Sequence, residues 1–379
     1  MRLSFGDTRK TATSVFTLIF LFLILLTVIG CGNGGNNGNA NKSKPKPLMG
    51  ISEWTNTGAA ISGYSIPSLA YDVEHDVLYA ATFEHGVWKY DGKNWNDISG
   101  EISGYSVGTL LYEPTHEVLY AGCISDVQYD KCYGVWKYDG RSWTDISGPL
   151  NLYSIASLAY DSNHNLLYAG CTEVGDGSTD TGSRGVWKYD GTGWANTSGG
   201  VARFWISSLA YDSIHDLLYA GESRGWGAWR YNGSKWSEVG GKLSHYSIEC
   251  MAYDPTNNLL YAGCTDVYSE IYAKGVWKYD GGAWIATGGA VSDCTILSVL
   301  YDPTQDLLYA GCYDSVITGS TYPRLPSTRG LWVFDGVTWT DISGGLKNYS
   351  VSSLAYDSTH SLLFAGTSEH GVWKQNTHR

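Results

Sequence analysis

One pattern of apolar and polar positions occurs seven times between residues 51 and 379. Each unit contains a short apolar run that ends in Ala-Tyr-Asp or a close variant, a turn, and a second apolar run, Leu-Leu-Tyr-Ala-Gly. A stretch of variable length follows, and then Gly-Val-Trp-Lys-Tyr-Asp-Gly and another Trp. Alternation of side chains between two faces, as in Val-Trp-Lys-Tyr, is typical of β-strands, and Asp-Gly supplies a tight turn. The unit therefore predicts four short strands, named A to D in chain order.

The repeat length indicates the fold class. Consecutive units are 41 to 55 residues apart when they are aligned on the tyrosine that ends strand A. Four short strands in a period of about 40 to 50 residues are the signature of a propeller blade. The sequence thus predicts an all-β protein in which residues 51–379 fold as one seven-bladed β-propeller. The aligned tyrosines are Tyr71, Tyr112, Tyr160, Tyr211, Tyr253, Tyr301 and Tyr356.

Tryptophan positions predict how the ring closes. One Trp lies in each strand C and another in each strand D, but the last unit ends after Trp373 without a strand D. Trp54 lies before the first full unit, and its spacing of ten residues to Tyr64 equals that from Trp95 to Tyr105. We therefore expect an N-terminal strand containing Trp54 to complete the last blade, which would remove two exposed sheet edges. Two tryptophans fall outside this scheme, Trp205 and Trp226.

The unit resembles the blades of Asp-box propellers, which carry the bacterial neuraminidase repeat, and more distantly the blades of tectonin-type lectins. The resemblance covers residues 51–379 and implies the propeller fold. The Asp-box pattern is Ser-x-Asp-x-Gly-x-Thr-Trp, whereas Asp91 and Trp95 of this chain are one residue closer together. Asp-boxes are structural turns that lie away from active sites, so the resemblance implies no catalytic residue.

The N-terminus predicts export. Three basic residues precede an uncharged, largely apolar stretch at residues 11–29, which is the order of a secretory signal peptide. A stretch of this length could also stay in the membrane as an uncleaved helix, since about 20 apolar residues suffice. The run Val-Ile-Gly-Cys that ends at Cys31 resembles the bacterial lipoprotein signal. That resemblance implies cleavage after residue 30 and a lipid on Cys31.

Three regions follow from this N-terminus: a lipoprotein signal peptide at residues 1–30, a flexible tether at residues 31–50, and the propeller at residues 51–379. The tether is rich in Gly, Asn, Lys and Pro and has no apolar periodicity. Two or more acyl chains hold a protein stably on a membrane. We expect an extracytoplasmic protein that is anchored by lipid to the cell envelope, at the outer membrane or the cell surface.

Composition and charge narrow the expected partners. Charged side chains make up 16% of the chain, compared with roughly 25% in average soluble domains, and aromatic residues make up 14%. Residues 1–30 carry three basic groups and one acidic group, so their removal changes the net charge from −12 to −14. Such an acidic surface repels phosphate backbones. We expect no nucleic-acid partner, and we expect a monomer.

Length variation is confined to the connection between strands B and C, because the A–B, C–D and D–A spacings are the same in every unit. In a propeller the B–C and D–A connections emerge on one face, which we call the loop face, and the A–B and C–D turns emerge on the opposite turn face. Loops on rigid scaffolds carry binding residues. The sequence predicts a ligand site on the loop face with contributions from Asp126, Arg184, Asp266, Tyr268, Asp314, Arg324 and Arg329. The long loops could also be tolerated surface insertions.

Aromatic residues at the start of strand A form a second candidate site. Tyrosine is found at this position in five units, and we expect it near the central channel on the loop face. Each phenol offers a flat apolar body with a polar tip, which could stack on a sugar or grip a peptide. Packing against the neighbouring blade is the alternative. The tyrosines are Tyr64, Tyr105, Tyr153, Tyr246 and Tyr349.

The histidines and acidic loops give little support for a metal. Five histidines share one position in the A–B turn, where hydrogen bonding within the turn accounts for them. The acidic segment at residues 176–182 is rich in oxygen ligands but lacks the spacing of a calcium loop. We expect no cofactor, with calcium as the alternative. The histidines are His75, His116, His164, His215 and His360.

Seven cysteines follow Cys31, in a compartment that could permit disulfides. Cys123 and Cys132 bracket one B–C loop and are the predicted disulfide. Two further pairs, Cys250 with Cys264 and Cys294 with Cys312, each link strand A to strand B, but the repeat allows at most one of them to be well placed.

These features favour a binding module that recognises a glycan or a protein through the loop face. No catalytic constellation is visible: only eight arginines follow residue 31, and none matches the arginine positions of sialidases with similar blades. Glycosidases need two carboxylates about 5 to 10 Å apart, and sequence alone does not locate such a pair. A structural or assembly scaffold and a glycan-active hydrolase or lyase remain the alternatives.

Overall fold

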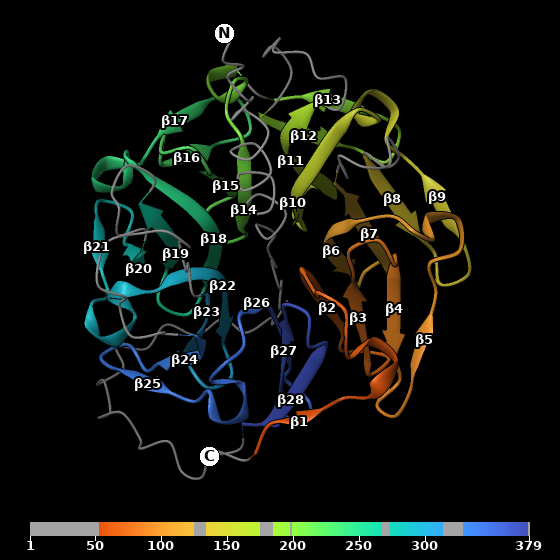
Figure 1. The fold of residues 1–379 in the computed structure, drawn as a ribbon. Coiled ribbons are helices and arrows are strands. Elements are labelled where there is room, and N and C mark those ends of the chain that lie inside the picture. The colour runs from red at the N-terminus through yellow and green to blue at the C-terminus, as the bar shows by residue number, and fades with distance from the viewer. Residues whose placement is uncertain are drawn as a thin grey trace, which may run out of the picture.

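The computed structural model describes residues 53–124, 134–174, 185–197, 199–266, 273–313 and 329–377. Their strands form seven four-stranded antiparallel sheets arranged in a ring (Figure 1). The prediction of an all-β, seven-bladed propeller is confirmed. Within these ranges there is no α-helix, and no helix is long and apolar enough to cross a bilayer.

Each blade places strand A next to the central axis and strand D at the outer rim (Figure 1). Blade 1 consists of β2 (Ser68–Asp72), β3 (Val77–Ala81), β4 (Val87–Tyr90) and β5 (Trp95–Asp97). Blade 2 consists of β6 (Val107–Glu113), β7 (Val118–Cys123), β8 (Val135–Tyr138) and β9 (Trp143–Asp145). Blade 3 consists of β10 (Tyr153–Asp161), β11 (Leu166–Val174), β12 (Gly185–Tyr189) and β13 (Trp194–Asn196).

The other four blades repeat this order. Blade 4 consists of β14 (Ile206–Asp212), β15 (Leu217–Glu222), β16 (Ala228–Tyr231) and β17 (Trp236–Glu238). Blade 5 consists of β18 (Tyr246–Asp254), β19 (Leu259–Asp266), β20 (Ala273–Tyr279) and β21 (Trp284–Ala286). Blade 6 consists of β22 (Thr295–Asp302), β23 (Leu307–Tyr313), β24 (Gly330–Phe334) and β25 (Trp339–Asp341). Blade 7 consists of β26 (Val351–Asp357), β27 (Leu362–Thr367), β28 (Val372–Asn376) and β1 (Thr55–Asn56).

A short 3₁₀ helix lies in each D–A connection, and each buries one apolar side chain at the rim of the ring. These helices are η1 (Ala59–Ile61), η2 (Gly100–Ile102), η3 (Gly148–Leu150), η4 (Gly199–Val201), η5 (Gly241–Leu243), η6 (Gly289–Asp293) and η7 (Gly344–Leu346).

The N-terminal strand closes the ring, as the position of Trp54 predicts. β1 pairs antiparallel with β28, so that Thr55 lies opposite Lys374 and Asn56 lies opposite Trp373. β1 is therefore the outer strand of the blade that contains the C-terminal strands (Figure 1). This pairing ties the two ends of the propeller together.

The outer tryptophans connect neighbouring blades. The indole of each strand-D tryptophan donates a hydrogen bond of 2.7 to 3.1 Å to the segment that follows strand D of the preceding blade. Trp54 takes part through a bond of 2.9 Å to the Ile342 carbonyl oxygen. This shared contact explains why a tryptophan recurs at every strand D. The donors are Trp54, Trp95, Trp143, Trp194, Trp236, Trp284 and Trp339.

Strands A and B form the core, and apolar clusters fill the spaces between adjacent sheets. The glycine that ends Leu-Leu-Tyr-Ala-Gly lies where two blades approach closely. A Cβ on Gly311 would be 2.6 Å from the Val351 carbonyl oxygen of the next blade and 2.4 Å from Ser298 Oγ. A larger residue there would force the blades apart.

Candidate functional site

The loop face carries an aromatic site in blade 4, where the B–C connection is short and fully described. Trp226 lies in this connection with 57% of its surface exposed. Its ring stacks on Phe204, which comes from the preceding D–A connection, with ring centroids 5.6 Å apart. Phe204 also packs against Trp229 of β16 at 5.2 Å. The exposed indole of Trp226 thus stacks on Phe204, and Phe204 in turn packs against Trp229.

A cation–π contact extends this site. The guanidinium carbon of Arg224 lies 3.2 Å from the centroid of the Trp205 ring, an arrangement that attracts the cation to the face of the indole. The Ser223 amide donates to the Trp205 carbonyl oxygen at 3.0 Å, which joins the B–C connection to the D–A connection. We call Phe204, Trp205, Arg224 and Trp226 the blade-4 platform.

A buried carboxylate holds the platform in shape. Glu222 ends β15 and is only 1% exposed. Its oxygens accept hydrogen bonds from the backbone amides of Trp205 at 3.3 Å, Arg224 at 2.7 Å and Trp226 at 3.0 Å. Burial raises the pKa of Glu222, and the three amide donors partly offset that rise. The same side chain therefore orients both connections that build the platform.

A second buried acid, Glu249 of β18, lies beside this carboxylate. Burial raises the pKa of Glu249 to about 7, and the charge of Glu222 contributes to the rise. Its Oε2 has no hydrogen-bond partner among the described residues. Glu222 and Glu249 are 1% and 4% exposed, respectively. Both carboxylates are therefore almost completely shielded from solvent.

Departures from the repeat in the sequence mark this site. Trp205 and Trp226 are the two tryptophans outside the repeat scheme. Glu222 occupies the position after the strand-B glycine, where four blades have a buried cysteine and two have a threonine that bonds the loop backbone. The residues aligned with Glu222 are Thr82, Cys123, Cys171, Cys264, Cys312 and Thr367.

The expected placement of the strand-A tyrosines near the channel is wrong. Each ring is half-buried and packs against the strand-C tryptophan of its own blade, at centroid distances of 5.7 to 6.3 Å. Strand C is the third strand from the axis, so the rings lie away from the channel. The alternative was packing against the neighbouring blade, whereas these contacts lie within one blade. A role in binding stays a prediction. The residues are Tyr64, Tyr105, Tyr153, Tyr246 and Tyr349.

Two predicted loop residues lie within the described ranges. Arg329 donates from Nη1 to the Asn348 carbonyl oxygen at 3.1 Å, which ties it to the next D–A connection. Asp266 ends β19, and its backbone lies opposite Tyr246. Five predicted residues lie outside the described ranges: Asp126, Arg184, Tyr268, Asp314 and Arg324.

Six of the seven cysteines after Cys31 lie within the described residues. Cys123 is buried at the end of β7, but Cys132 lies outside the described residues, so their disulfide stays a prediction. No disulfide joins two of the described cysteines. Cys250 lies opposite Gly263, and Cys264 lies opposite Ile248, so this pair is not directly opposed in the sheet.

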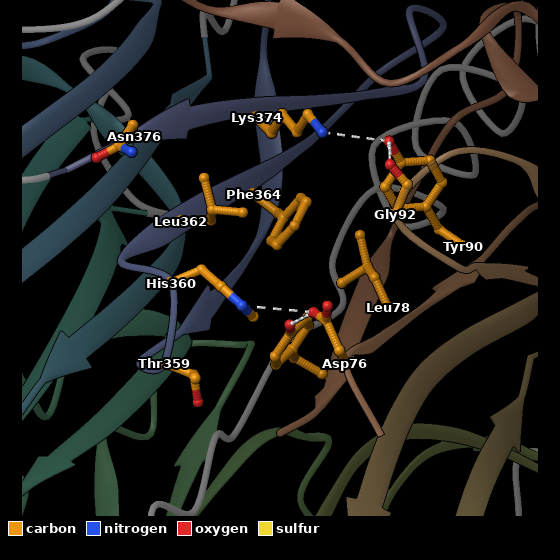
Figure 2. Close-up of a pocket in the computed structure, with 11 residues that line it drawn as sticks. Asp76, Leu78, Tyr90, Gly92, Thr359, His360, Leu362, Phe364, Lys374 and Asn376 are labelled. Carbon is orange, nitrogen blue, oxygen red and sulfur yellow. Dashed lines mark hydrogen bonds and ion pairs between the residues drawn. The ribbon is translucent and has the colours of Figure 1, made fainter. Parts of the chain in front are cut away.

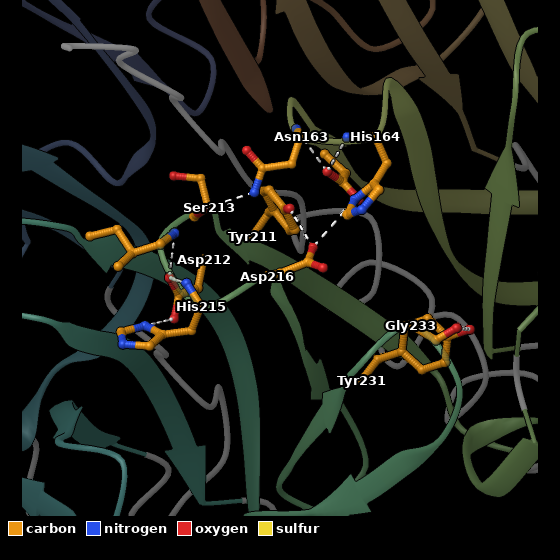
Figure 3. Close-up of polar contacts among 11 residues, drawn as sticks. Asn163, His164, Tyr211, Asp212, Ser213, His215, Asp216, Tyr231 and Gly233 are labelled. Carbon is orange, nitrogen blue, oxygen red and sulfur yellow. Dashed lines mark hydrogen bonds and ion pairs between the residues drawn. The ribbon is translucent and has the colours of Figure 1, made fainter.

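The turn-face histidines cap their own turns, as expected. In blade 4, Asp212 accepts hydrogen bonds from the amides of Ile214 and His215 and contacts His215 Nδ1 at 2.8 Å (Figure 3). Aspartate commonly stabilises turns by bonding backbone amides two and three residues ahead. His164 makes the same contact with Asp161 in blade 3.

Neighbouring turns also contact each other across blades. His164 Nδ1 lies 3.4 Å from Asp216 Oδ1, and Asn163 donates to the Ser213 carbonyl oxygen at 2.9 Å (Figure 3). As a result, two groups of three side chains have ligand atoms close enough to hold a metal ion. Each group combines residues from two neighbouring blades. The acidic segment at residues 176–182, the calcium alternative, lies outside the described residues. The two groups are Asp161, His164 and Asp216, and Asp76, Asp357 and His360.

Comparison with solved structures supports the propeller fold. The extracellular domain of BT4673 from B. thetaiotaomicron, assigned to a one-component system, is similar with a TM-score of 0.59 and 15% identity. The similarity covers 85% of this chain and 39% of that chain. YCF48 bound to a D1 peptide is similar with a TM-score of 0.57 and 12% identity, over 89% of this chain and 98% of that chain.

A chain of a mitotic checkpoint complex is similar with a TM-score of 0.60 and 12% identity, over 92% of this chain and 99% of that chain. No protein-family model and no curated protein matches the sequence. At identities this low, the similarities show a shared fold, which proteins with unrelated functions can adopt.

Proposed function

We propose that the chain is an extracytoplasmic binding module that holds a protein ligand on its loop face, with the blade-4 platform as the anchor. The observation that carries the proposal is the exposed Trp226 ring, supported by Phe204 and adjacent to Arg224. Tryptophan and arginine are among the residues most enriched in the energetic centres of protein interfaces. Among proteins of similar fold, YCF48 is bound to a peptide.

The platform is preorganised for binding. Glu222 holds both connections through backbone amides, so a ligand would not have to order them. Preorganisation improves affinity because less conformational entropy is lost on binding. The long B–C loops predicted to carry Asp126, Arg184, Tyr268, Asp314 and Arg324 would add contacts from other blades.

A glycan is the second candidate ligand. Trp226 presents a broad flat indole to solvent, and such a surface suits the apolar face of a sugar ring. A protein ligand and a glycan would share the platform, so one variant tests both, and the identity of the bound partner distinguishes them.

Trp226→Ala should weaken ligand binding by at least about tenfold, because truncating an anchor of this kind removes roughly 2 kcal/mol or more. The ligand would first be identified by a pull-down from the source envelope and by a glycan array, and its affinity then measured by calorimetry. Folding should be unaffected, since Trp226 is exposed.

Val337→Ala is the matched control, because Val337 is 69% exposed in a C–D turn on the opposite face. Its affinity should equal that of the wild type. Unchanged affinity for Trp226→Ala would place the contact elsewhere. A scaffold with a broad interface would instead lose binding only when several blades are altered together.

We further propose that Cys31 carries the lipid that tethers the module to the envelope. Cys31→Ser should give a precursor that keeps residues 1–30 and gains no acyl mass, since the modified thiol is missing. Intact-mass measurement of the purified protein checks this. Membrane fractionation would be uninformative, because the apolar stretch at residues 11–29 could itself hold the precursor in the membrane. A wild-type protein that begins elsewhere than Cys31 would contradict the proposal.

A further inference from the structure

A cavity of about 540 Å³ lies between blades 7 and 1 and opens on the turn face, opposite the loop face (Figure 2). Its walls come from the A–B turns of both blades, the C–D turn of blade 1, and the middle of β27 and β28. Leu78, Leu362 and Phe364 supply apolar walls, while Lys374, Asn376 and Asp76 supply charged and polar groups. Ligand sites commonly combine an apolar lining with a few placed polar groups in this way.

A phenylalanine at this blade boundary replaces a tyrosine that is found at the other six. Strand B carries a tyrosine at the same position in every blade except blade 7, where Phe364 takes its place. In blade 4 this tyrosine, Tyr219, lies opposite Arg230 of strand C, and in blade 1 Tyr79 lies opposite Lys89. Phe364 lies opposite Lys374 in the same register but has no hydroxyl group to offer. The tyrosines are Tyr79, Tyr120, Tyr168, Tyr219, Tyr261 and Tyr309.

Lys374 lines the cavity and has hydrogen-bonding capacity left over. Its Nζ lies 3.3 Å from the Tyr90 hydroxyl and 5.5 Å from the centroid of that ring. The Tyr90 hydroxyl itself donates to the Gly92 carbonyl oxygen at 2.8 Å, so it serves Lys374 as an acceptor. Within the described ranges no carboxylate pairs with Lys374. An ammonium group has three donors, so it can also bind an anionic ligand.

The opposite side of the cavity can receive hydroxyl groups. Asp76 accepts a hydrogen bond from Tyr71 and lies 3.7 Å from His360 Nδ1 (Figure 2). The Asp76 side chain is 61% exposed, which leaves its carboxylate accessible as an acceptor. Asn376 and Thr359 add an amide and a hydroxyl to the lining.

We propose that this cavity binds a small hydroxylated monocarboxylate, with the chemistry of a sugar acid, whose carboxylate contacts Lys374. A single cation balances a single negative charge. A dianion such as a phosphate ester would face Asp76 with no second unpaired cation beside it in the described lining. The site lies on the other face from the blade-4 platform, so it is independent of the function proposed above.

Glucuronate is the probe, with glucose as its uncharged counterpart, and binding is measured by calorimetry at low salt. Wild-type protein should bind glucuronate at least about tenfold more tightly than glucose, since removal of a charge-assisted bond costs more than one power of ten. Lys374→Met should abolish this preference. Phe364→Tyr should weaken glucuronate binding at least about tenfold, because the new hydroxyl occupies the cavity and bonds Lys374.

Two control measurements test whether a loss of glucuronate binding reflects the cavity itself. Phe364→Tyr should melt no lower than the wild type, because six other blades carry tyrosine there. Tyr309→Phe is the control: it removes the equivalent hydroxyl in blade 6, where the opposing residue is Val333 rather than a cation, so glucuronate affinity should not change. The proposal is overturned if the wild type shows no glucuronate binding at millimolar concentration, or if folded Lys374→Met and Phe364→Tyr both bind like the wild type.

Discussion

Trp54→Ala is expected to lower the free energy of unfolding of the whole propeller by about 3–5 kcal/mol, the usual effect of truncating a buried tryptophan. Trp54 is only 5% exposed and packs with Ile342, Leu346 and Val351 between blades 6 and 7. Its indole also donates to the Ile342 carbonyl oxygen. The substitution removes apolar area and leaves that buried carbonyl without its donor.

The position of Trp54 makes the effect global. β1 contributes only Thr55 and Asn56 to the ladder with β28, so Trp54 supplies much of what holds the last blade closed. Thermal and denaturant unfolding of the variant, monitored by circular dichroism, measure the change. Deletion of residues 32–48, in the predicted tether, is the control and should leave the melting temperature unchanged. A wild-type melting curve for Trp54→Ala would show that closure by β1 adds little stability.

Glu222→Ala is expected to destabilise blade 4 by more than about 3 kcal/mol and to abolish binding to the blade-4 platform. The substitution leaves three amide donors, those of Trp205, Arg224 and Trp226, without an acceptor. A buried donor without a partner costs roughly 1–3 kcal/mol, and the three contributions are not strictly additive because they share one acceptor group. The loop should then rearrange until water reaches these amides.

Glu222→Gln separates the hydrogen bonds from the charge. Glutamine keeps one carbonyl oxygen as an acceptor but loses the other, so the variant should fall between the wild type and Glu222→Ala in both stability and affinity. Unfolding free energy and ligand affinity are measured for all three proteins. If Glu222→Ala retained wild-type stability and bound the ligand normally, the amide contacts would not be what shapes the platform.

The order and number of the strands could be predicted because they depend on local chemistry that repeats. Alternation in Val-Trp-Lys-Tyr, turns at Asp-Gly, and a period of 41 to 55 residues each act over short distances. A single unit cannot bury its apolar faces alone, so the seven units pack against one another. The packed units form the ring. Even closure could be inferred, because Trp54 keeps the strand-D spacing of ten residues to Tyr64.

The tertiary structure decided which side chains meet across blades. The direction of the strand-A tyrosines depends on the strand-C tryptophan beside them, so their expected place near the channel was wrong. The platform joins residues from two connections through Glu222, a contact that no periodicity reveals. Phe364 lies opposite Lys374 in the wall of the cavity, a pairing that is apparent only once the register of β27 and β28 is known.

The sequence by itself therefore determined the blades, their number, their strand order and the strand that closes the ring, because these features rest on patterns within one unit. Only the tertiary structure decided where the departures from the pattern act. Trp226, Glu222 and Phe364 each break the repeat at a single position. A residue that occurs once gives no repeated pattern from which its role could be predicted. Its physical effect, an exposed ring, a buried acceptor or an unfilled space, is set by neighbours that are distant in the chain or on the next blade.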